Sequence, residues 1–413
     1  MSDAVSPLAP ESFPDMPPLA GVAISTHAGG LRYRGRKDLF LAILAEGTSV
    51  AGVFTQTLCP SAPVDWCRSI LNDGDGTARA VVCNSGNANA FTGQAGADAA
   101  SLTAQLIGDQ LGFDSRRIYL ASTGVIGEPL DEQSLRHELP KLVDGIAVSG
   151  VEAWRAAADA IRTTDTFSKG AWSSIDGAAA HVVGIAKGSG MIAPDMATML
   201  GFIFTDLPVE PDLLQECLSS AVRKSFNRIT VDSDTSTSDT VLLFATGEQI
   251  DDDLNDRHDA RFPAFQAALD SVCLDLAQQI VRDGEGATKF VEVTVTGAAS
   301  DDAATVIAKA IGDSPLVKTA LAAEDANWGR IVMAVGKAGQ AAERDKLAIW
   351  IGPEQVSADG MVLDSYSEDR ATVHLTGDEV VVKVDVGVGD GESTIWTCDL
   401  THGYIDINAG YRS

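Results

Sequence analysis

The sequence predicts a mixed α/β fold with α+β character. Two observations carry this prediction. Strand-like runs alternate with helical runs along the first 300 residues or so of the 413-residue chain, whereas the last third is richer in short strands. The length favours two to three domains as a prior, and no internal repeat is visible.

In the first half, short runs of β-branched and apolar residues predict strands, and a long segment with helical spacing of Ala and Leu, ended by glycine, predicts a helix. Two further segments have amphipathic helical spacing. The predicted strands are 50–55, 78–84 and 117–123, and the predicted helices are 95–112, 132–146 and 150–164.

The second half continues the alternation and then changes character. We predict strands at 181–188, 198–206, 239–247 and 289–297, and helices at 211–226 and 261–284. After residue 325 the pattern becomes short strands joined by turns, at 347–352, 371–377, 379–387 and 393–400. The intervening segment 249–262 is read as a solvated acidic loop.

Charge and composition narrow the function classes. The net charge of −28 repels phosphates and anionic lipid, so we expect neither nucleic acid nor membrane as a partner. The proline-rich residues 1–20 lack the pattern of a signal peptide, so we expect an extended arm and a cytoplasmic protein. Histidines show no metal-ligand spacing, and no metal is predicted. Six dispersed cysteines predict reduced, mostly buried thiols.

Two motifs combine glycine with polar side chains. In "NSGNANAFTG" (84–93) the amides are suited either to orienting a ligand or to shaping an irregular loop before a helix, and the structural interpretation is favoured. In "STGVIG" (122–127) the backbone after a strand could approach a reacting atom closely. Thr123 and Gly124 are therefore candidate oxyanion-hole residues, although glycines after strands are common.

The stretch "KGSGMIAPDMATMLGFIFTD" (187–206) places one threonine after a glycine-rich segment. Threonine is a weak nucleophile unless a base takes its proton, and the α-amine of an N-terminal threonine is such a base. Thr198 would reach that state if its hydroxyl attacked the carbonyl of Ala197 and cut the chain. The small Ala197 and the flexible Gly188 and Gly190 suit that reaction. An Ala-Thr pair inside a buried strand remains the ordinary alternative.

Two segments near the end of the chain carry candidate contacts. Glu285 lies between two glycines before a predicted strand, which is typical of a turn but also suits a carboxylate that binds an ammonium group. The terminal "YIDINAGYRS" contains Asn408 and Ser413 as polar candidates. Its aromatic and branched residues indicate a docked tail rather than a free one.

Taken together, these segments resemble the ornithine acetyltransferase family, the glutamate N-acetyltransferases of arginine biosynthesis. The resemblance spans nearly the whole chain after the N-terminal arm, and the "KGSGMIAP…MATML" block is its most specific part. The other matching segments are "AGVFT…SAPVDWCR", "NSGNANAFTG", "ASTGVIGEPL", "TTDTFSK", "FNRITVDSDTSTSDT", "VRDGEGATKFVEV", "NWGRI" and "INAGYRS".

The resemblance implies a layered α/β sandwich related to the DmpA-type self-processing aminopeptidases, with a smaller C-terminal α+β domain. It implies cleavage between Ala197 and Thr198, with Thr198 then acting as the nucleophile of ping-pong acetyl transfer from N2-acetylornithine to glutamate. Thr123 and Gly124 match the oxyanion residues. The substrate contacts fall at Thr163 or Thr164, with Thr163 favoured, and at Lys187, Thr198, Glu285, Asn408 and Ser413.

The implied organisation is an arm (1–20), an α chain (21–197), a β-chain core (198–300) and a C-terminal domain (301–413). The resemblance also implies an α2β2 heterotetramer and no cofactor, and leaves acetyl-CoA open as a second donor. A self-processing aminopeptidase or amidase, with water as acceptor, is the main alternative; a binding module on the same fold is the other. The chain departs from the family pattern at Ser233 and Ser238, where Gly and Asn are common, and in the less usual "AAEDANWGRI".

Overall fold

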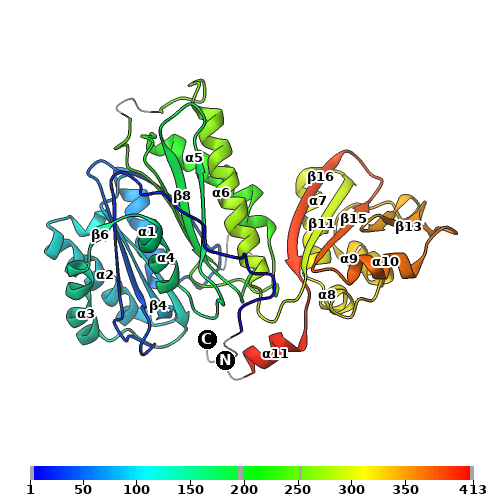
Figure 1. Ribbon diagram of the computed structural model, residues 1–413, viewed down its shortest axis with the longest axis horizontal. Helices are drawn as coiled ribbons and strands as arrows, with labels where there is room; N and C mark the ends of the chain where they lie inside the picture. The colour runs from blue at the N-terminus through cyan, green and yellow to red at the C-terminus, as the bar shows by residue number, and fades with distance from the viewer. Residues whose placement is uncertain (1–3, 194–198, 251–253, 410–413) are drawn as a thin grey trace.

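The computed structural model describes residues 4–193, 199–250 and 254–409 and contains three β-sheets. Figure 1 shows two of them packed together on the left and the third on the right. The mixed α/β class predicted from the sequence is confirmed.

The first sheet has the strand order β5-β4-β2-β1-β6, and the second has the order β3-β10-β9-β8-β7. Both mix parallel and antiparallel neighbours, with β4–β5 and β9–β10 parallel. The first sheet consists of β1 (Val22–His27), β2 (Leu39–Leu44), β4 (Ala80–Asn87), β5 (Ile118–Val125) and β6 (Ala147–Val148). The second consists of β3 (Ser49–Phe54), β7 (Lys169–Ser174), β8 (His181–Lys187), β9 (Leu200–Thr205) and β10 (Thr240–Ala245).

Buried aromatic rings join the two sheets face to face. The ring of Phe202 in β9 lies 5.4 Å from that of Phe40 in β2, and the ring of Phe244 in β10 lies 6.1 Å from that of Tyr119 in β5. Phe204, two residues after Phe202, packs at 5.3 Å on Trp154 of the helix Val151–Ala160. Ile203, between Phe202 and Phe204, belongs instead to the cluster formed with the outer helices. Because successive strand residues point to opposite faces, β9 is buried on both sides, which explains its nearly continuous apolar sequence.

Helices cover the outer faces of this sandwich. The helices α2 (Gly93–Leu111) and α3 (Glu132–Asp144) pack on the first sheet, and α5 (Pro211–Lys224) and α6 (Phe262–Arg282) pack on the second. Two more, α1 (Ala62–Asp73) and α4 (Val151–Ala160), touch strands of both sheets. None of the described helices is long and apolar enough to span a membrane.

The third sheet has the order β14-β13-β12-β15-β11-β16 and its own hydrophobic core. Its strands are β11 (Phe290–Ala298), β12 (Ala348–Ile351), β13 (Glu354–Ala358), β14 (Met361–Val362), β15 (Glu379–Asp385) and β16 (Gly391–Cys398). It packs with α7 (Asp301–Gly312), α8 (Pro315–Ala322), α9 (Trp328–Lys337) and α10 (Glu368–Leu375). The predicted boundary at residue 300 stays a prediction; β11, which precedes it, pairs with β15 and β16.

The predicted strand at 371–377 is wrong, because this segment lies in and directly after helix α10. The Ser367 side chain accepts a hydrogen bond from the N–H of Arg370 and so caps the helix, and two acidic residues occupy its first turn. Ala371 and Leu375 are buried one helical turn apart. The alternation of Thr and Val that suggested a strand is overridden by this capping and packing.

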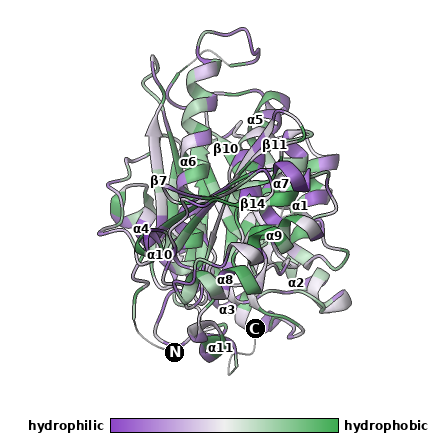
Figure 2. Ribbon diagram, turned by 90° about the vertical axis from the view of Figure 1, so that its right-hand side faces the viewer, coloured by the Kyte–Doolittle hydropathy of each residue, from purple (hydrophilic) through white to green (hydrophobic). Residues whose placement is uncertain are grey.

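The two ends of the described chain pack against the body. Residues 4–20 of the arm form no helix or strand, but Met16 is fully buried against the sandwich core. The final helix α11 (His402–Asn408) runs back beside Gly286, and Figure 1 places it below the junction of the two parts. Figure 2 shows hydrophilic residues in the loop at the upper end of α6, where residues 255–258 are exposed as predicted, although Leu254 is buried.

Candidate active site

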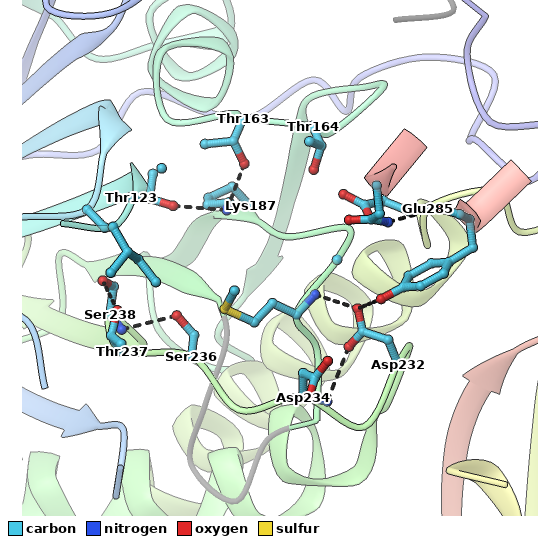
Figure 3. A pocket seen from close by; sticks show the side chains of 17 residues that line it. Thr123, Thr163, Thr164, Lys187, Asp232, Asp234, Ser236, Thr237, Ser238 and Glu285 are labelled. Atoms are coloured by element: carbon cyan, nitrogen blue, oxygen red, sulfur yellow. Dashed lines mark hydrogen bonds between the residues drawn. The ribbon is translucent and has the colours of Figure 1, made fainter. Parts of the chain in front are cut away.

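A polar pocket of about 250 Å³ lies where β5, β8, the loop before β10 and helix α11 meet. Figure 3 shows threonines and a lysine on one side of it and carboxylates on the other. The described residues that line it are Ala88, Thr123, Gly124, Ile126, Thr163, Thr164, Lys187, Gly190, Met191, Asp232, Asp234, Ser236, Thr237, Ser238, Glu285, Tyr404 and Asn408.

Lys187 forms the cationic wall of the pocket. It ends β8, whose pairing with β9 sets it beside Leu200, two residues after Thr198 in the sequence. Its Nζ donates hydrogen bonds to the hydroxyls of Thr123 and Thr163, each at 3.1 Å (Figure 3). Two hydroxyl groups thus orient the ammonium group toward the pocket, and none of the described carboxylates forms an ion pair with it, so its charge is available to an anionic ligand.

Gly124 occupies a position where only glycine fits. Its φ is +130°, and a Cβ there would come within 2.2 Å of the carbonyl carbon of Gly86, its partner across the β4–β5 pair. The two glycines let these strands approach closely at their carboxyl ends. The peptide at 123–124 is therefore held in place at the pocket wall, which suits a backbone donor to a reacting oxygen.

A buried ion network fixes the segment that carries Thr163. Asp165 accepts hydrogen bonds from the N–H of Thr163 (3.0 Å) and of Gly188 (2.6 Å). Lys169 lies between Asp165 (2.7 Å) and Asp283 (2.5 Å), and none of the three side chains is exposed. Burial alone would raise the pKa of Asp165, but Lys169 and Lys187 outweigh it and hold that pKa well below its usual range.

Glu285 and Asn408 form the opposite wall. The Asn408 amide donates to Glu285 Oε2 at 2.6 Å, and the N–H of Glu285 donates to the carbonyl of Ser189. Only 9% of Glu285 is exposed, and burial raises the pKa of its carboxyl. Gly190 passes so close that a Cβ there would lie 2.5 Å from the Glu285 carboxyl carbon. The carboxylate is thus held at the pocket surface by a neutral side chain.

Asp232 organises the loop that leads toward the Ala197–Thr198 pair. Its two oxygens accept from the N–H groups of Met191 (2.6 Å) and Ile192 (2.7 Å), and Tyr404 donates to it at 3.2 Å. Met191 and Ser233 both have positive φ, +58° and +63°. This backbone conformation explains why glycine suits position 233 better than serine.

The structure brings seven of the ten predicted site residues to this one pocket. They are Thr123, Gly124, Thr163, Thr164, Lys187, Glu285 and Asn408. Thr163 contacts Lys187, whereas Thr164 shares a hydrogen bond with Ser189 (2.7 Å), so both threonines face the pocket and the choice between them as the substrate contact stays open. Ala197, Thr198 and Ser413 lie outside the described residues.

The asparagines of "NSGNANAFTG" serve the backbone, as the favoured interpretation holds. Asn84 donates to the carbonyl of Asn87, and Asn89 donates to that of Gly96 at the start of α2. Among the described residues, no cluster of three His, Cys, Asp or Glu side chains could hold a metal ion. All six cysteines are free and five are buried, which confirms the thiol prediction.

Comparison with known proteins assigns the chain that forms this pocket to a family. A sequence profile of the ArgJ family matches residues 23–413. The chain belongs to the ArgJ family. It is 53% identical, over the full length of both chains, to proteins named arginine biosynthesis bifunctional protein ArgJ in Agrobacterium fabrum and in Rhizobium meliloti. The crystal structure of the ArgJ protein from Bacillus halodurans is 45% identical with a TM-score of 0.50; the match covers all of that chain and 52% of this one.

Several pocket residues in this ArgJ family member were not predicted as site residues, namely Asp232, Asp234, Ser236, Thr237, Ser238 and Tyr404. All but Tyr404 come from "VDSDTSTSD", whose dense run of small polar residues between buried segments was the available signal. Asp239, the last residue of this stretch, is buried, and its carboxyl group accepts a hydrogen bond from the N–H of Met199. Burial raises its pKa well above the usual range, and nearby Lys187 opposes that shift.

Proposed function

We propose that this protein transfers the acetyl group of N2-acetyl-L-ornithine to L-glutamate by way of an acetyl-threonine intermediate on Thr198. The observation that carries the proposal is the division of charge in the pocket. Lys187 stands on one wall beside Thr123, and Glu285 and Asp232 stand on the other. A pocket of this kind fits a small amino acid whose α-carboxylate meets the lysine and whose side chain reaches the acidic wall.

The chain would first cut itself between Ala197 and Thr198 into residues 1–197 and 198–413. The Thr198 hydroxyl attacks the carbonyl carbon of Ala197, the peptide C–N bond breaks as an ester forms, and water hydrolyses the ester. The match to the solved ArgJ chain supports this step, because that whole chain corresponds to 52% of this one. Residues 198–413 make up the same share of the sequence.

Acetyl transfer would then use the new N-terminus. The α-amine of Thr198 takes the proton of its own hydroxyl, and Oγ attacks the acetyl carbonyl of the donor. The hydroxyl of Thr123 and the N–H of Gly124 stabilise the negative oxygen that develops. The C–N bond to ornithine breaks, with the amine proton returned to the leaving nitrogen. Glutamate's amine then attacks the acetyl ester, and Thr198 is regenerated.

Substrate contacts are assigned by charge. Lys187, held by Thr123 and Thr163, would bind the α-carboxylate that donor and acceptor share. Glu285, Asn408 and Ser413 would contact the remainder of the substrate, with Thr164 beside Glu285. No cofactor enters this scheme. We further propose acetyl-CoA as a second acetyl donor, since the relatives are named bifunctional, together with an α2β2 assembly in the cytoplasm.

A paired assay with three chains tests the proposal. Wild type should run as two chains and should form acetylglutamate from glutamate with either acetylornithine or acetyl-CoA. Thr198→Ala should remain one inactive chain, whereas Thr198→Ser, which keeps a hydroxyl, should still be cut. Acetate release without acetylglutamate would assign the protein to hydrolysis instead. An uncut wild-type chain with full activity would remove Thr198 from the mechanism.

A further inference from the structure

Glu285 is a buried carboxyl group with neutral polar neighbours. Among the residues that the structure describes, no Lys, Arg or His lies within ion-pair distance of it, and its side-chain contacts are the Asn408 amide at 2.6 Å and the hydroxyl of Thr164. It lies against the backbone of Gly190 at the pocket surface. Among the described residues, no ion pair therefore holds Glu285 in its carboxylate form.

The neighbouring acids are held differently. Asp232 accepts hydrogen bonds from the N–H groups of Met191, Ile192 and Asp234 and from the hydroxyl of Tyr404. Asp165 and Asp283 share the ammonium group of Lys169. Hydrogen-bond donors and a nearby cation favour the charged form of a carboxyl group, although burial still raises the pKa of Asp283. Glu285 differs from these three in that its carboxyl group is contacted by the neutral side chains of Thr164 and Asn408.

In the proposed reaction, a positively charged and then a negatively charged end of a substrate would lie beside Glu285. Both substrates would set their α-carboxylates at Lys187, because the acetyl group stays on one threonine between the two half-reactions. The far end of acetylornithine is then an ammonium group, and the far end of glutamate is a carboxylate. A carboxylate at position 285 attracts the first and repels the second.

We propose that Glu285 is a proton-coupled specificity residue: it is ionised when an ornithine ligand occupies the pocket and protonated when a glutamate ligand does. This inference rests on the proposed function. The proton enters from water when glutamate binds and returns to water when an ornithine ligand binds, so no other reactant is needed. In its protonated state Glu285 donates its O–H to the side-chain carboxylate of glutamate.

The charged groups around Glu285 favour this exchange. Asp232 and, near it, Asp234 are like charges on the adjoining loop, Tyr404 is a titratable neighbour on α11, and Lys187 on β8 is the opposing cation. Burial raises the pKa of Glu285, Asp232 raises it further, and Lys187 and the hydrogen bonds of Thr164 and Asn408 oppose the rise. The pKa of Glu285 is therefore raised, which makes its protonated form more accessible when a ligand carboxylate lies beside it.

Isotope-exchange reactions separate the two half-reactions in the intact enzyme. A ping-pong enzyme exchanges labelled ornithine with acetylornithine in the absence of glutamate, and labelled glutamate with acetylglutamate in the absence of ornithine. We would measure kcat/KM for both exchanges between pH 5.5 and 8.5 and take their ratio. Titration of the shared nucleophile cancels in that ratio. If one proton separates the two bound states, the ornithine-to-glutamate ratio rises about tenfold for each pH unit.

Glu285→Gln fixes a neutral side chain of the same shape. We expect it to lose ornithine exchange by at least about 10²-fold more than glutamate exchange and to make the ratio independent of pH. Glu285→Asp should restore the slope. Glu216→Gln, the same substitution at an exposed surface pair with Arg257, is the matched control and should leave the slope unchanged.

Each outcome decides the inference. A wild-type ratio that does not change with pH overturns it, as does an equal loss of both exchanges in Glu285→Gln. If Glu285→Gln does not fold, the wild-type slope alone decides. Absence of both exchanges in wild type would instead refute the proposed ping-pong function, so the two failures are distinguishable.

Discussion

Removing the ammonium group of Lys169 should destabilise the protein more than any substitution of an exposed lysine. Lys169 is fully buried, and its Nζ lies 2.7 Å from Asp165 and 2.5 Å from Asp283. Lys169→Met keeps the length of the side chain and removes the charge. Two buried carboxyl groups would then lose their shared cation, while the hydrogen bonds of Asp165 to Thr163 and Gly188 remain.

The magnitude follows from these distances. At an effective dielectric constant near 20, each pair has a Coulomb energy of roughly 6 kcal/mol before desolvation is subtracted. Desolvation cancels much of this, but breaking one side of a buried ion pair typically costs about 3–5 kcal/mol, because the other charge stays buried and unpaired. We therefore expect the free energy of unfolding at pH 7 to fall by about 3–5 kcal/mol.

The contribution of Asp165 to the pH dependence of stability should change sign. In wild type the pKa of Asp165 is lowered, so its contribution to stability is present above the ordinary carboxyl pKa of about 4 and is lost as pH falls through the lower folded value. Burial already raises the pKa of Asp283 in wild type. Without Lys169, burial should raise the pKa of Asp283 further and bring that of Asp165 above its unfolded value. The variant should then gain stability as pH falls from 7 toward 5.

Urea unfolding followed by tryptophan fluorescence measures both effects. Lys224→Met is the matched control, since Lys224 lies 2.7 Å from Asp270 at an exposed surface and should cost less than about 1 kcal/mol. A loss below about 1 kcal/mol in Lys169→Met, or the same pH dependence as wild type, would refute the reasoning about this network.

Three further predictions concern the pocket and the thiols. Thr123→Ala should lower kcat by about 10²–10³, and Lys187→Ala should mainly raise KM for acetylornithine and glutamate alike. Because the two side chains touch at 3.1 Å, the double variant should lose less transition-state stabilisation than the sum of the two single losses. Strict additivity of the two losses in steady-state assays would contradict this. Gly124→Ala should abolish activity and lower the melting temperature, because its Cβ would collide with the Gly86 backbone; a stable, active Gly124→Ala enzyme would show that the strands can separate there. Only the exposed Cys59 should react rapidly with a disulfide reagent in the native protein, because the other five thiols are buried. Burial also raises the pKa of Cys67 to about 12 and that of Cys217 to about 11, which keeps these thiols protonated and unreactive. Rapid reaction of several thiols would show that the core opens.

Much of the alternation of strands and helices could be predicted because its periodicity is strong. The helix 95–112 and the strands 50–55, 239–247 and 289–297 lie within about two residues of α2, β3, β10 and β11. The strands β1 and β2 escape prediction, because a run such as "LFLAIL" has no periodicity that distinguishes a buried strand from a buried helix.

The site was predicted where a motif carries its own backbone requirement. Thr123 and Gly124 lie near the end of β5, and Lys187 ends β8 directly before Gly188. Thr123, Gly124 and Lys187 all line the pocket. The acidic wall could not be derived in the same way. Asp232 becomes a pocket residue only because the chain near Met191 folds back onto it and α11 returns from the far end of the sequence. Such long-range contacts leave no local pattern.

The most direct test of the account is mass spectrometry of the enzyme incubated with acetylornithine and without glutamate. We predict a chain that begins at Thr198 and carries one acetyl group on that residue, lost when glutamate is added and replaced by an equal amount of acetylglutamate. An active enzyme that remains a single uncut chain, or an acetyl group on any residue other than Thr198, would contradict the N-terminal threonine mechanism.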